Sequence, residues 1–505
     1  MDDASTSQSV VAWLRGGGPW GAPPAVIETH AAIVFLSGDR AFKMKKPVSL
    51  GYLDFSTLEA RRSTLARELV LNRRTASGFY LGLVPVVAQG SSFALDGVGD
   101  AVEWLLEMKR FPEGSLLSER LAAGALGTDT IEVLARGVAR FHDSAAIVAD
   151  VDWSAAVQRI AGENEQDLLS LQSVFEGQRL KDQLLRRNAR LAALGPALRR
   201  QDGDVRQCHG DLHLGNVFLD GDVPTLFDCI EFSSFYAQIP PLYDIAFLLM
   251  DLLARGERFL ANRALNAWMM ARDTARWPDD MAALALLPLY VALRAEIRAK
   301  TEARRAGGAA AACHYLDLAA ASALPSEPRL IVIGGLSGTG KSTLARGLAS
   351  QAFAGVGAVH LRSDEIRKRL AGIELSERLP SSSYTPEVSG WVYEMLYRLA
   401  GTCLDAGADV VVDAVFARAE ERDRIEQTAR VCGVPFLGFW LEAPPAVLEA
   451  RVAGRKGDVS DADSAVLKAQ LAYDTGAIGW TRVDVSGQPE QVERTALDVI
   501  GRVDG

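Results

Sequence analysis

The eight residues Gly335–Ser342 combine glycines, a lysine and a hydroxyl group in the order G-x-x-x-x-G-K-[ST]. Glycines let backbone N–H groups converge on phosphate oxygens, and a following helix directs its positive end at them. Lys341 then reaches the β- and γ-phosphates of a nucleotide, and the Ser342 hydroxyl binds Mg²⁺. This pattern predicts a site for ATP and Mg²⁺. The residues expected to hold the nucleotide are Gly335, Ser337, Gly338, Thr339, Gly340, Lys341, Ser342 and Thr343.

Charged residues follow the loop at positions that suit phosphoryl transfer. Asp413 ends the strand-like run Asp409-Val-Val-Val-Asp413, where a strand-end carboxylate is expected to bind Mg²⁺. Asp364 follows a strand-like run and begins a helix that carries Arg367 one turn later. Arg451 and Arg455 are four residues apart, on one helical face. Each feature also has a structural interpretation, as a strand-end cap, a helix cap and a solvated helix face.

Residues 329–505 resemble the small P-loop kinases, a group that includes gluconate kinase, chloramphenicol phosphotransferase and the zeta toxins. The resemblance implies that Asp364 holds and deprotonates the acceptor hydroxyl, and that Arg367 binds a polar or anionic group of the substrate. It also implies that Arg451 and Arg455 belong to a lid that closes over the transferred phosphoryl group, with Lys341 as a further catalytic residue.

A second constellation lies upstream, in the stretch Cys208–Leu219. Asp211 and Asn216 are five residues apart, and Asp228 follows Asn216 by twelve residues. The sequence Asp220-Gly-Asp222 between two apolar runs predicts a hairpin that returns Asp228 to the loop. One carboxylate can then accept a substrate proton while Asn216 and Asp228 bind Mg²⁺. The structural alternative is a polar turn beside a hairpin.

The spacing of this stretch resembles the aminoglycoside-phosphotransferase-like branch of the protein-kinase fold, whose loop has the pattern H-G-D-x-H-x-x-N. The resemblance covers about residues 24–323. It implies that Asp211 is the catalytic base, that Asn216 and Asp228 are metal ligands, and that His209 braces the loop. Asp244 is expected to have a structural role.

That branch requires a strand lysine and a helix glutamate to bind the nucleotide. Lys43 fits the strand position, and Lys45 is an alternative because it projects to the same side of the strand. Ser56-x-x-Glu59 predicts a capping box, which leaves Glu68, on the opposite side of the helix, to pair with Lys43.

The sequence therefore predicts two domains. Residues 1–324 are expected to form an α+β, bilobal, protein-kinase-like domain with lobes at about 24–110 and 111–324. Residues 325–328 contain two prolines and are expected to be a linker. Residues 329–505 are expected to form an α/β P-loop domain with a parallel sheet.

Composition and charge limit the partners and the cellular compartment that are expected for the chain. The 505 residues have ordinary globular composition and a net charge of −10, so no nucleic-acid partner is expected. Five scattered cysteines without a CxxC pair favour a reducing compartment. We find no signal peptide, and the longest apolar run is too short to span a bilayer. A cytoplasmic chain without a membrane partner is expected, and the oligomeric state stays open.

These observations predict an ATP- and Mg²⁺-dependent phosphotransferase with two kinase-like domains, bifunctional if both sites are active. Its acceptor is expected to be a hydroxyl of a small molecule. The alternative is regulatory: the N-terminal domain senses a ligand and controls a P-loop kinase that acts on a macromolecule. The absence of a G-x-G-x-x-G loop between Glu28 and Lys43 favours the alternative.

Overall fold

The computed structural model describes residues 3–49, 53–324, 327–454 and 459–503. Its contacts divide the chain into two compact units. Unit 1 comprises Met1–Leu134, Ser144–Val151 and Asp204–Asp244, and unit 2 comprises Ala135–Asp143, Asp152–Gly203 and Ile245–Gly505. The domain boundary at residue 324 stays a prediction, and Pro325 and Ser326 of the expected linker lie outside the described residues.

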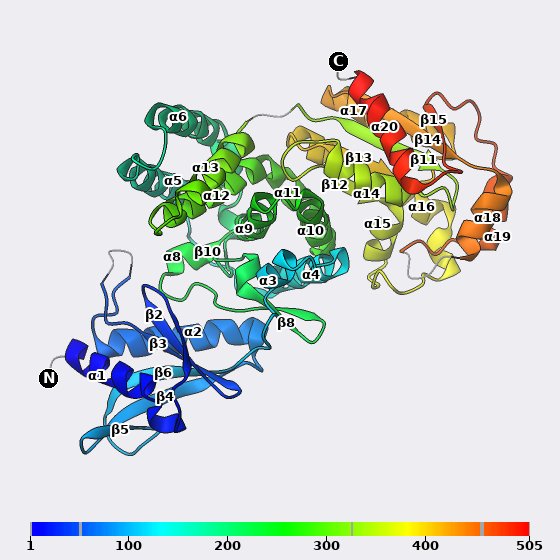
Figure 1. Ribbon diagram of the computed structural model, residues 1–505. Helices are drawn as coiled ribbons and strands as arrows, with labels where there is room; N and C mark the ends of the chain where they lie inside the picture. The colour runs from blue at the N-terminus through cyan, green and yellow to red at the C-terminus, as the bar shows by residue number, and fades with distance from the viewer. Residues whose placement is uncertain (1–2, 50–52, 325–326, 455–458, 504–505) are drawn as a thin grey trace. The chain divides into compact units, whose positions relative to one another are not determined.

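Unit 1 is built on an antiparallel sheet with strand order β1-β2-β3-β6-β4-β5 (Figure 1). The apolar face of helix α1 packs on this sheet through Val10 and Leu14, which join a buried cluster with Phe35 and Leu105. The bounds are α1 Asp3–Arg15, η1 Gly18–Trp20, β1 Ala25–Glu28, β2 Ala32–Ser37, β3 Arg40–Lys45, α2 Leu58–Ala76, β4 Tyr80–Gln89, β5 Ser92–Leu95 and β6 Ala101–Lys109.

Helix α2 turns one face to the interior of unit 1. Its buried positions, spaced three or four residues apart, are Arg61, Leu65, Glu68, Asn72 and Ala76. The helix starts one residue later than the capping-box prediction requires. Thr57 is the N-cap and accepts a hydrogen bond from the Ala60 amide, while Glu59 pairs with Arg62. The capping box is therefore wrong, because the threonine hydroxyl satisfies the helix start without Glu59.

The rest of unit 1 consists of short elements around the expected catalytic loop. Strands β8 and β9 form an antiparallel hairpin whose turn contains Gly221 at φ 61°, as the sequence predicts. The bounds are α3 Leu117–Ala122, β7 Arg206–Gln207, η3 Leu214–Asn216, β8 Val217–Asp220, β9 Val223–Leu226, α8 Ser234–Ala237 and β10 Gln238–Ile239.

Unit 2 begins with a helical region. Alanine- and leucine-rich faces pack against one another there, most extensively between α12 and α13. Over the described ranges, no helix combines the length and the apolarity needed to cross a bilayer. The bounds are α4 Thr128–Ser144, η2 Asp202–Asp204 and α9 Pro241–Ala254, which each contain a unit boundary, and α5 Trp153–Ser170, α6 Gly177–Ala193, α7 Gly195–Arg199, α10 Arg258–Ala271, η4 Thr274–Arg276, α11 Trp277–Ala282, η5 Ala283–Leu286, α12 Leu287–Ala303 and α13 Ala309–Ser322.

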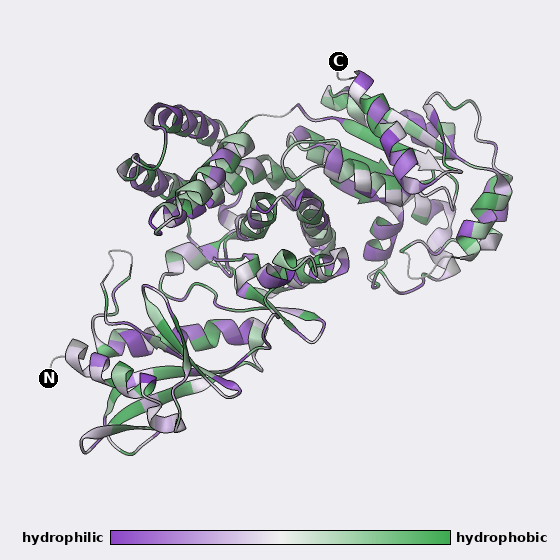
Figure 2. Ribbon diagram, in the orientation of Figure 1, coloured by the Kyte–Doolittle hydropathy of each residue, from purple (hydrophilic) through white to green (hydrophobic). Residues whose placement is uncertain are grey.

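Unit 2 continues into a parallel sheet with strand order β12-β13-β11-β14-β15. Figure 2 colours the strands around β11 and β13 as hydrophobic, which is typical of a parallel sheet buried on both faces. This α/β fold confirms the prediction for the C-terminal region. The bounds are β11 Leu330–Gly335, α14 Lys341–Gln351, β12 Val359–Arg362, α15 Ser363–Leu370, η6 Ser381–Tyr384, α16 Pro386–Asp405, β13 Val410–Asp413, α17 Ala419–Cys432, β14 Phe436–Glu442, α18 Pro445–Ala453, α19 Ser464–Leu471, β15 Thr481–Asp484 and α20 Pro489–Val503.

The order of the strands in the parallel sheet reverses at its central strand, β11. The chain places β12 and β13 on one side of β11, and β14 and β15 on the other. Ligands of such open sheets bind at the carboxyl ends of the strands where the order reverses. The loop after β11 and the residue that ends β13 therefore lie where a ligand is expected.

Candidate active sites

The loop from β11 to α14 needs glycine at three positions. Gly335, Gly338 and Gly340 have φ values of 143°, 86° and 82°, in the region that side chains rarely adopt. A Cβ atom at Gly335 would lie 2.6 Å from the Leu441 carbonyl oxygen, and one at Gly338 would lie 2.8 Å from the Leu448 carbonyl oxygen. Only glycines let this backbone pass so close to its neighbours, which gives the loop its compact turn.

Hydrogen bonds hold the side chains of the loop. Lys341 Nζ and Thr339 Oγ1 donate to the Leu336 carbonyl at 3.0 and 2.8 Å. The Ser337 amide donates to Gln470 Oε1 of α19 at 2.8 Å. Sequence reasoning missed Gln470, because no motif marks a residue that reaches the loop from 133 positions away.

Asp413 ends β13 and faces the start of α14. The Ser342 hydroxyl donates to Asp413 Oδ1 at 3.3 Å, and His360 Nε2 lies 2.6 Å from Oδ2. Burial opposes the ionised form of Asp413, but the hydrogen bond and charge of His360 lower its pKa on balance. Burial lowers the pKa of His360. In this pair the His360 Nε2–H donates, because an ionised carboxylate only accepts hydrogen bonds.

These oxygens suit Mg²⁺. A hydroxyl and an ionised carboxylate are the hard oxygen ligands that Mg²⁺ takes from a protein when nucleotide phosphates and waters supply the rest. Ser342 and Asp413 are close enough to share one ion, since their oxygens are already 3.3 Å apart.

One cavity of about 1600 Å³ joins the loop to the residues expected to act on the acceptor. Its walls include the phosphate-binding loop, the start of α15, the end of β13 and part of α18 and α19. The predicted site residues that line it are Ser337, Gly338, Gly340, Lys341, Ser342, Thr343, Asp364, Arg367, Asp413 and Arg451.

The acceptor-side residues have different degrees of restraint. Asp364 lies in the first turn of α15. Arg367 donates to the Ser383 carbonyl at 2.7 Å and its guanidinium lies 5.0 Å from the Tyr384 ring centre. Arg451 donates to the Val485 carbonyl at 2.7 Å. Arg455 lies outside the described residues, so its role in a lid stays a prediction.

The second site lies in unit 1. Asn216 Nδ2 donates to both the carbonyl and the Oδ2 of Asp211, each at 2.9 Å. These bonds use the donor end of the Asn216 amide and leave Oδ1 as the end that can bind a cation. His209 Nε2 lies 2.9 Å from the Phe227 carbonyl, and the Asp244 carboxylate accepts the amides of His209 and Gly210. These contacts fit the bracing and structural roles expected for His209 and Asp244.

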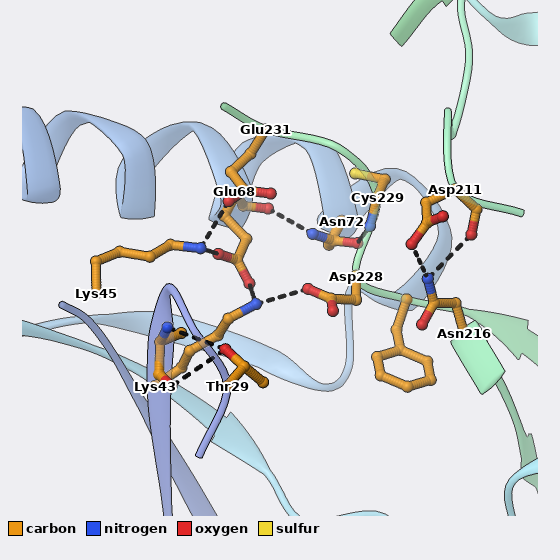
Figure 3. A network of polar contacts seen from close by, with 12 residues as sticks. Thr29, Lys43, Lys45, Glu68, Asn72, Asp211, Asn216, Asp228, Cys229 and Glu231 are labelled. Atoms are coloured by element: carbon orange, nitrogen blue, oxygen red, sulfur yellow. Dashed lines mark hydrogen bonds and ion pairs between the residues drawn. The ribbon is translucent and has the colours of Figure 1, made fainter. Parts of the chain in front are cut away.

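Lys43 joins the expected helix glutamate to the expected metal ligand (Figure 3). Its Nζ lies 2.7 Å from Glu68 Oε1 and 2.6 Å from Asp228 Oδ1. Burial favours the neutral amine, but the two carboxylates raise the pKa of Lys43 well above its ordinary value. Burial likewise opposes ionisation of Asp228, and Lys43 lowers that pKa on balance. Asp228 has φ 58°, a conformation that Asp tolerates and that is frequent at functional sites.

Lys45 adds a second buried ion pair to the same glutamate. Its Nζ lies 2.8 Å from Glu68 Oε2 and 2.6 Å from Glu231 Oε1. The two lysines therefore share Glu68, whereas the sequence treats Lys45 as an alternative to Lys43. Sequence reasoning missed Glu231, which follows Asp228 by only three residues and is nearly buried.

Figure 3 shows that the predicted site residues of unit 1 form two hydrogen-bonded groups. One group is Lys43, Glu68 and Asp228, and the other is Asp211 and Asn216. These are the residue types that a kinase-like site uses as its base, its metal ligands and its phosphate-binding lysine.

Comparison with known proteins identifies both regions. Residues 103–287 match the Phosphotransferase enzyme family, and residues 330–475 match an AAA domain family. Uncharacterized protein Rv2004c of Mycobacterium tuberculosis (strain ATCC 25618 / H37Rv) is 31% identical over 489 residues, which cover 92% of this chain and 93% of that protein. An adenylyl-sulfate kinase of Shewanella oneidensis is 31% identical over 206 residues, 37% of this chain and 92% of that enzyme. The structure of a Plasmodium vivax ethanolamine kinase matches 60% of this chain and 82% of its own, with 9% identity and a TM-score of 0.37.

A phosphotransferase region followed by a P-loop kinase region defines the class of protein: the chain is a phosphotransferase, an enzyme of the kinase type. Both resemblances drawn from the sequence are confirmed. Because the two sequences align over nearly their whole lengths, the chain belongs to the same family as Rv2004c.

Proposed function

We propose that the chain transfers the γ-phosphoryl group of ATP to a hydroxyl of a small molecule, with Mg²⁺ bound beside the nucleotide. At the P-loop site, Lys341 stabilises the charge of the transferred group, and Ser342 and Asp413 bind the ion. Asp364 accepts the proton of the acceptor hydroxyl. Arg367 binds the acceptor, and Arg451 and Arg455 compensate negative charge on the phosphoryl group.

The observation that carries this proposal is the shared cavity. It is lined by the phosphate-binding loop, by Asp413, which we propose binds the metal, and by Asp364, which we propose faces the acceptor. A kinase site needs these three groups around one space, since catalysis of phosphoryl transfer consists mainly of positioning and charge stabilisation. A volume of about 1600 Å³ leaves room for a nucleotide and a small acceptor together.

The assignment of Asp364 can be tested by replacing it with asparagine, which has nearly the same shape but is a poor base. In the full chain, Asp364→Asn is expected to lower phosphoryl transfer by about 10²-fold or more while ATP affinity changes only a few-fold. Asp423→Asn, at an exposed position of α17, is the matched control. If ATP binding weakened as much as turnover, Asp364 would be a nucleotide or fold element and not the base.

Unit 1 carries the same reaction in a kinase-like arrangement. We assign Asp211 as its base, Asn216 and Asp228 as its metal ligands, and Lys43, held by Glu68, as its phosphate-binding cation. The donor end of Asn216 faces Asp211, which supports this division of roles because the remaining amide oxygen is a metal-binding group.

The five cysteines, all free thiols, support a cytoplasmic location.

A regulatory function for unit 1 is the second candidate. Protein kinases cover the phosphates with a glycine-rich loop between their first two strands. Here that connection is a short turn in which the Thr29 amide donates to the Ala32 carbonyl at 2.9 Å, and its two intervening residues are His30 and Ala31. A turn without glycine supports a site that binds a nucleotide or another ligand and controls the P-loop reaction without performing its own transfer.

A further inference from the structure

Helix α10 lies in the segment that matches the Phosphotransferase enzyme family, yet within unit 2 it packs against α14, α15 and β12 of the P-loop region. Two asparagines on this helix are fully or nearly buried. Asn262 Nδ2 lies 2.9–3.3 Å from the carbonyl oxygens of Ala349, Val356 and Ala358. The contact is thus polar and specific, rather than a loose apolar packing.

Asn266 continues the parallel sheet in place of a further strand. Strand β12 is at the edge of the sheet, and its Val359 amide turns inward to the Asp409 carbonyl. The neighbouring backbone groups turn outward. Asn266 Nδ2 donates to the Ala358 carbonyl at 3.2 Å, and Asn266 Oδ1 accepts the His360 amide at 2.6 Å. One side-chain amide therefore supplies the donor and the acceptor that a peptide group of an adjacent strand would supply.

His360 carries this contact to the P-loop site. Its backbone amide is held by Asn266, and its Nε2 lies 2.6 Å from Asp413 Oδ2. Because Ser342 donates to Oδ1, both oxygens of Asp413 have a donor and its rotamer is fixed. Each oxygen keeps lone pairs, so the restrained carboxylate remains able to bind a cation.

We propose that Asn266 and His360 are positioning residues for metal binding at the P-loop site, so that a helix of the phosphotransferase-family segment orients the carboxylate of Asp413. The inference rests on the proposed function in one respect, the assignment of Asp413 as a metal ligand. Groups that hydrogen-bond a metal-ligating residue orient it, and their loss typically weakens metal binding by about 10- to 100-fold.

The test measures how far Mg²⁺ tightens binding of the β,γ-imido analogue of ATP to the full chain, by titration calorimetry with and without the ion. An Asp228→Asn background, which is isosteric, silences the metal ligand proposed in unit 1. In His360→Leu the tightening is expected to fall by about 10-fold or more while affinity without Mg²⁺ stays within a few-fold. His360→Gln can still place an N–H near Asp413 and is expected to restore most of the tightening.

Asn266→Leu keeps the shape of the side chain but removes both outward hydrogen bonds to β12, and is expected to weaken the Mg²⁺ effect by several-fold. The matched control is Arg369→Met. Arg369 of α15 donates to the carbonyls of Ala271 and Arg272 at the end of α10, away from β12. That change is expected to leave the Mg²⁺ effect within about two-fold.

The outcomes separate the inference from the proposed function. If Mg²⁺ does not tighten analogue binding in the unaltered P-loop site, the metal assignment itself is wrong. If it does, and His360→Leu keeps the full effect, the positioning role is overturned while the function stands. Two further results would overturn the positioning role, provided that thermal unfolding shows both variants to be folded. One is a loss of the Mg²⁺ effect in Arg369→Met equal to that in His360→Leu, and the other is no recovery of the effect in His360→Gln. General loosening of α10 or of the core would then explain the change.

Discussion

The two sites hold their carboxylates in different ways. In unit 1, Glu68, Asp228 and Glu231 each have a lysine partner at 2.6–2.8 Å. In the P-loop region, Asp413 accepts hydrogen bonds from the hydroxyl of Ser342 and the imidazole of His360. The unit 1 site is therefore set by ion pairs between distant segments, and the P-loop site by backbone geometry and by a hydroxyl and an imidazole donor.

This difference predicts how each site responds to its ligands. In unit 1, Lys43, the lysine proposed to bind phosphate, is already paired with Asp228, so a metal–nucleotide complex would have to exchange one set of charge pairs for another. The P-loop gains its phosphate-binding shape from glycines at positive φ, which need no charge rearrangement. We expect the P-loop site to bind nucleotide with less reorganisation.

The largest expected effect tests the P-loop side of the comparison. Lys341→Ala, in a full chain whose other site carries Asp211→Ala, is expected to lower ATP consumption by about 10²- to 10³-fold, because one cation that stabilises the transition state is lost. The loop should keep its fold, since its shape comes from glycines. Lys468→Ala, at an exposed position of α19, is the control. Unchanged ATP consumption would mean that the P-loop site does not perform the reaction.

The next effect tests whether unit 1 is a second working site. In the Lys341→Ala chain, any remaining phosphoryl transfer is expected to disappear on adding Asp211→Ala, with a loss of about 10²- to 10⁴-fold for a general base. Asp222→Ala, exposed in the β8–β9 turn, is the control. The regulatory candidate is favoured if the transfer that remains in the Lys341→Ala chain is insensitive to Asp211→Ala. It is also favoured if no transfer remains in that chain while ligands of unit 1 change the P-loop rate of the chain that keeps Lys341.

The sequence predicts those parts of the two sites that local patterns determine, but not the pairs that tertiary packing brings together. The phosphate-binding loop, its flanking strand and helix, and the spacing from Asp211 to Asp228 are contiguous, so local rules suffice. Lys43 and Glu68 pair as expected because strand alternation and helix periodicity fix their sides. The His360–Asp413 and Lys45–Glu231 pairs span 53 and 186 positions and depend on tertiary packing, which no local pattern records.

A smaller effect separates the two lysines of unit 1. Lys43→Met is expected to act chiefly on phosphoryl transfer, since Lys43 faces Asp228. Lys45→Met leaves Glu68 and Glu231 buried with less compensation, and is expected to lower the free energy of unfolding by about 3 kcal/mol. Urea unfolding of the full chain measures this loss. Lys45→Met with Glu231→Gln should regain most of it, because one buried carboxylate leaves with the amine. Equal effects of both lysines on stability and transfer would show that they act as one unit.

The smallest effect concerns Asp409, a partly buried carboxylate of the P-loop region whose Oδ1 accepts the Arg329 backbone amide at 3.1 Å. Burial outweighs this amide and raises the pKa of Asp409 to about 6. Because the unfolded chain releases this proton at a lower pH than the folded chain, stability is lost as pH rises from about 4 to about 6, and the loss is constant above that range.

Asp409→Asn keeps an oxygen for the Arg329 amide and removes the charge. We expect it to raise the free energy of unfolding by about 2 kcal/mol at pH 7.5 and by much less at pH 4.5. Urea unfolding at the two pH values measures this difference, with the exposed Asp423→Asn as control. A gain of the same size at both pH values would trace the effect to packing instead of ionisation. The difference between the two sites would then not hold at Asp409, because the charge of a carboxylate that accepts a backbone amide would be as well compensated as that of a carboxylate paired with lysine.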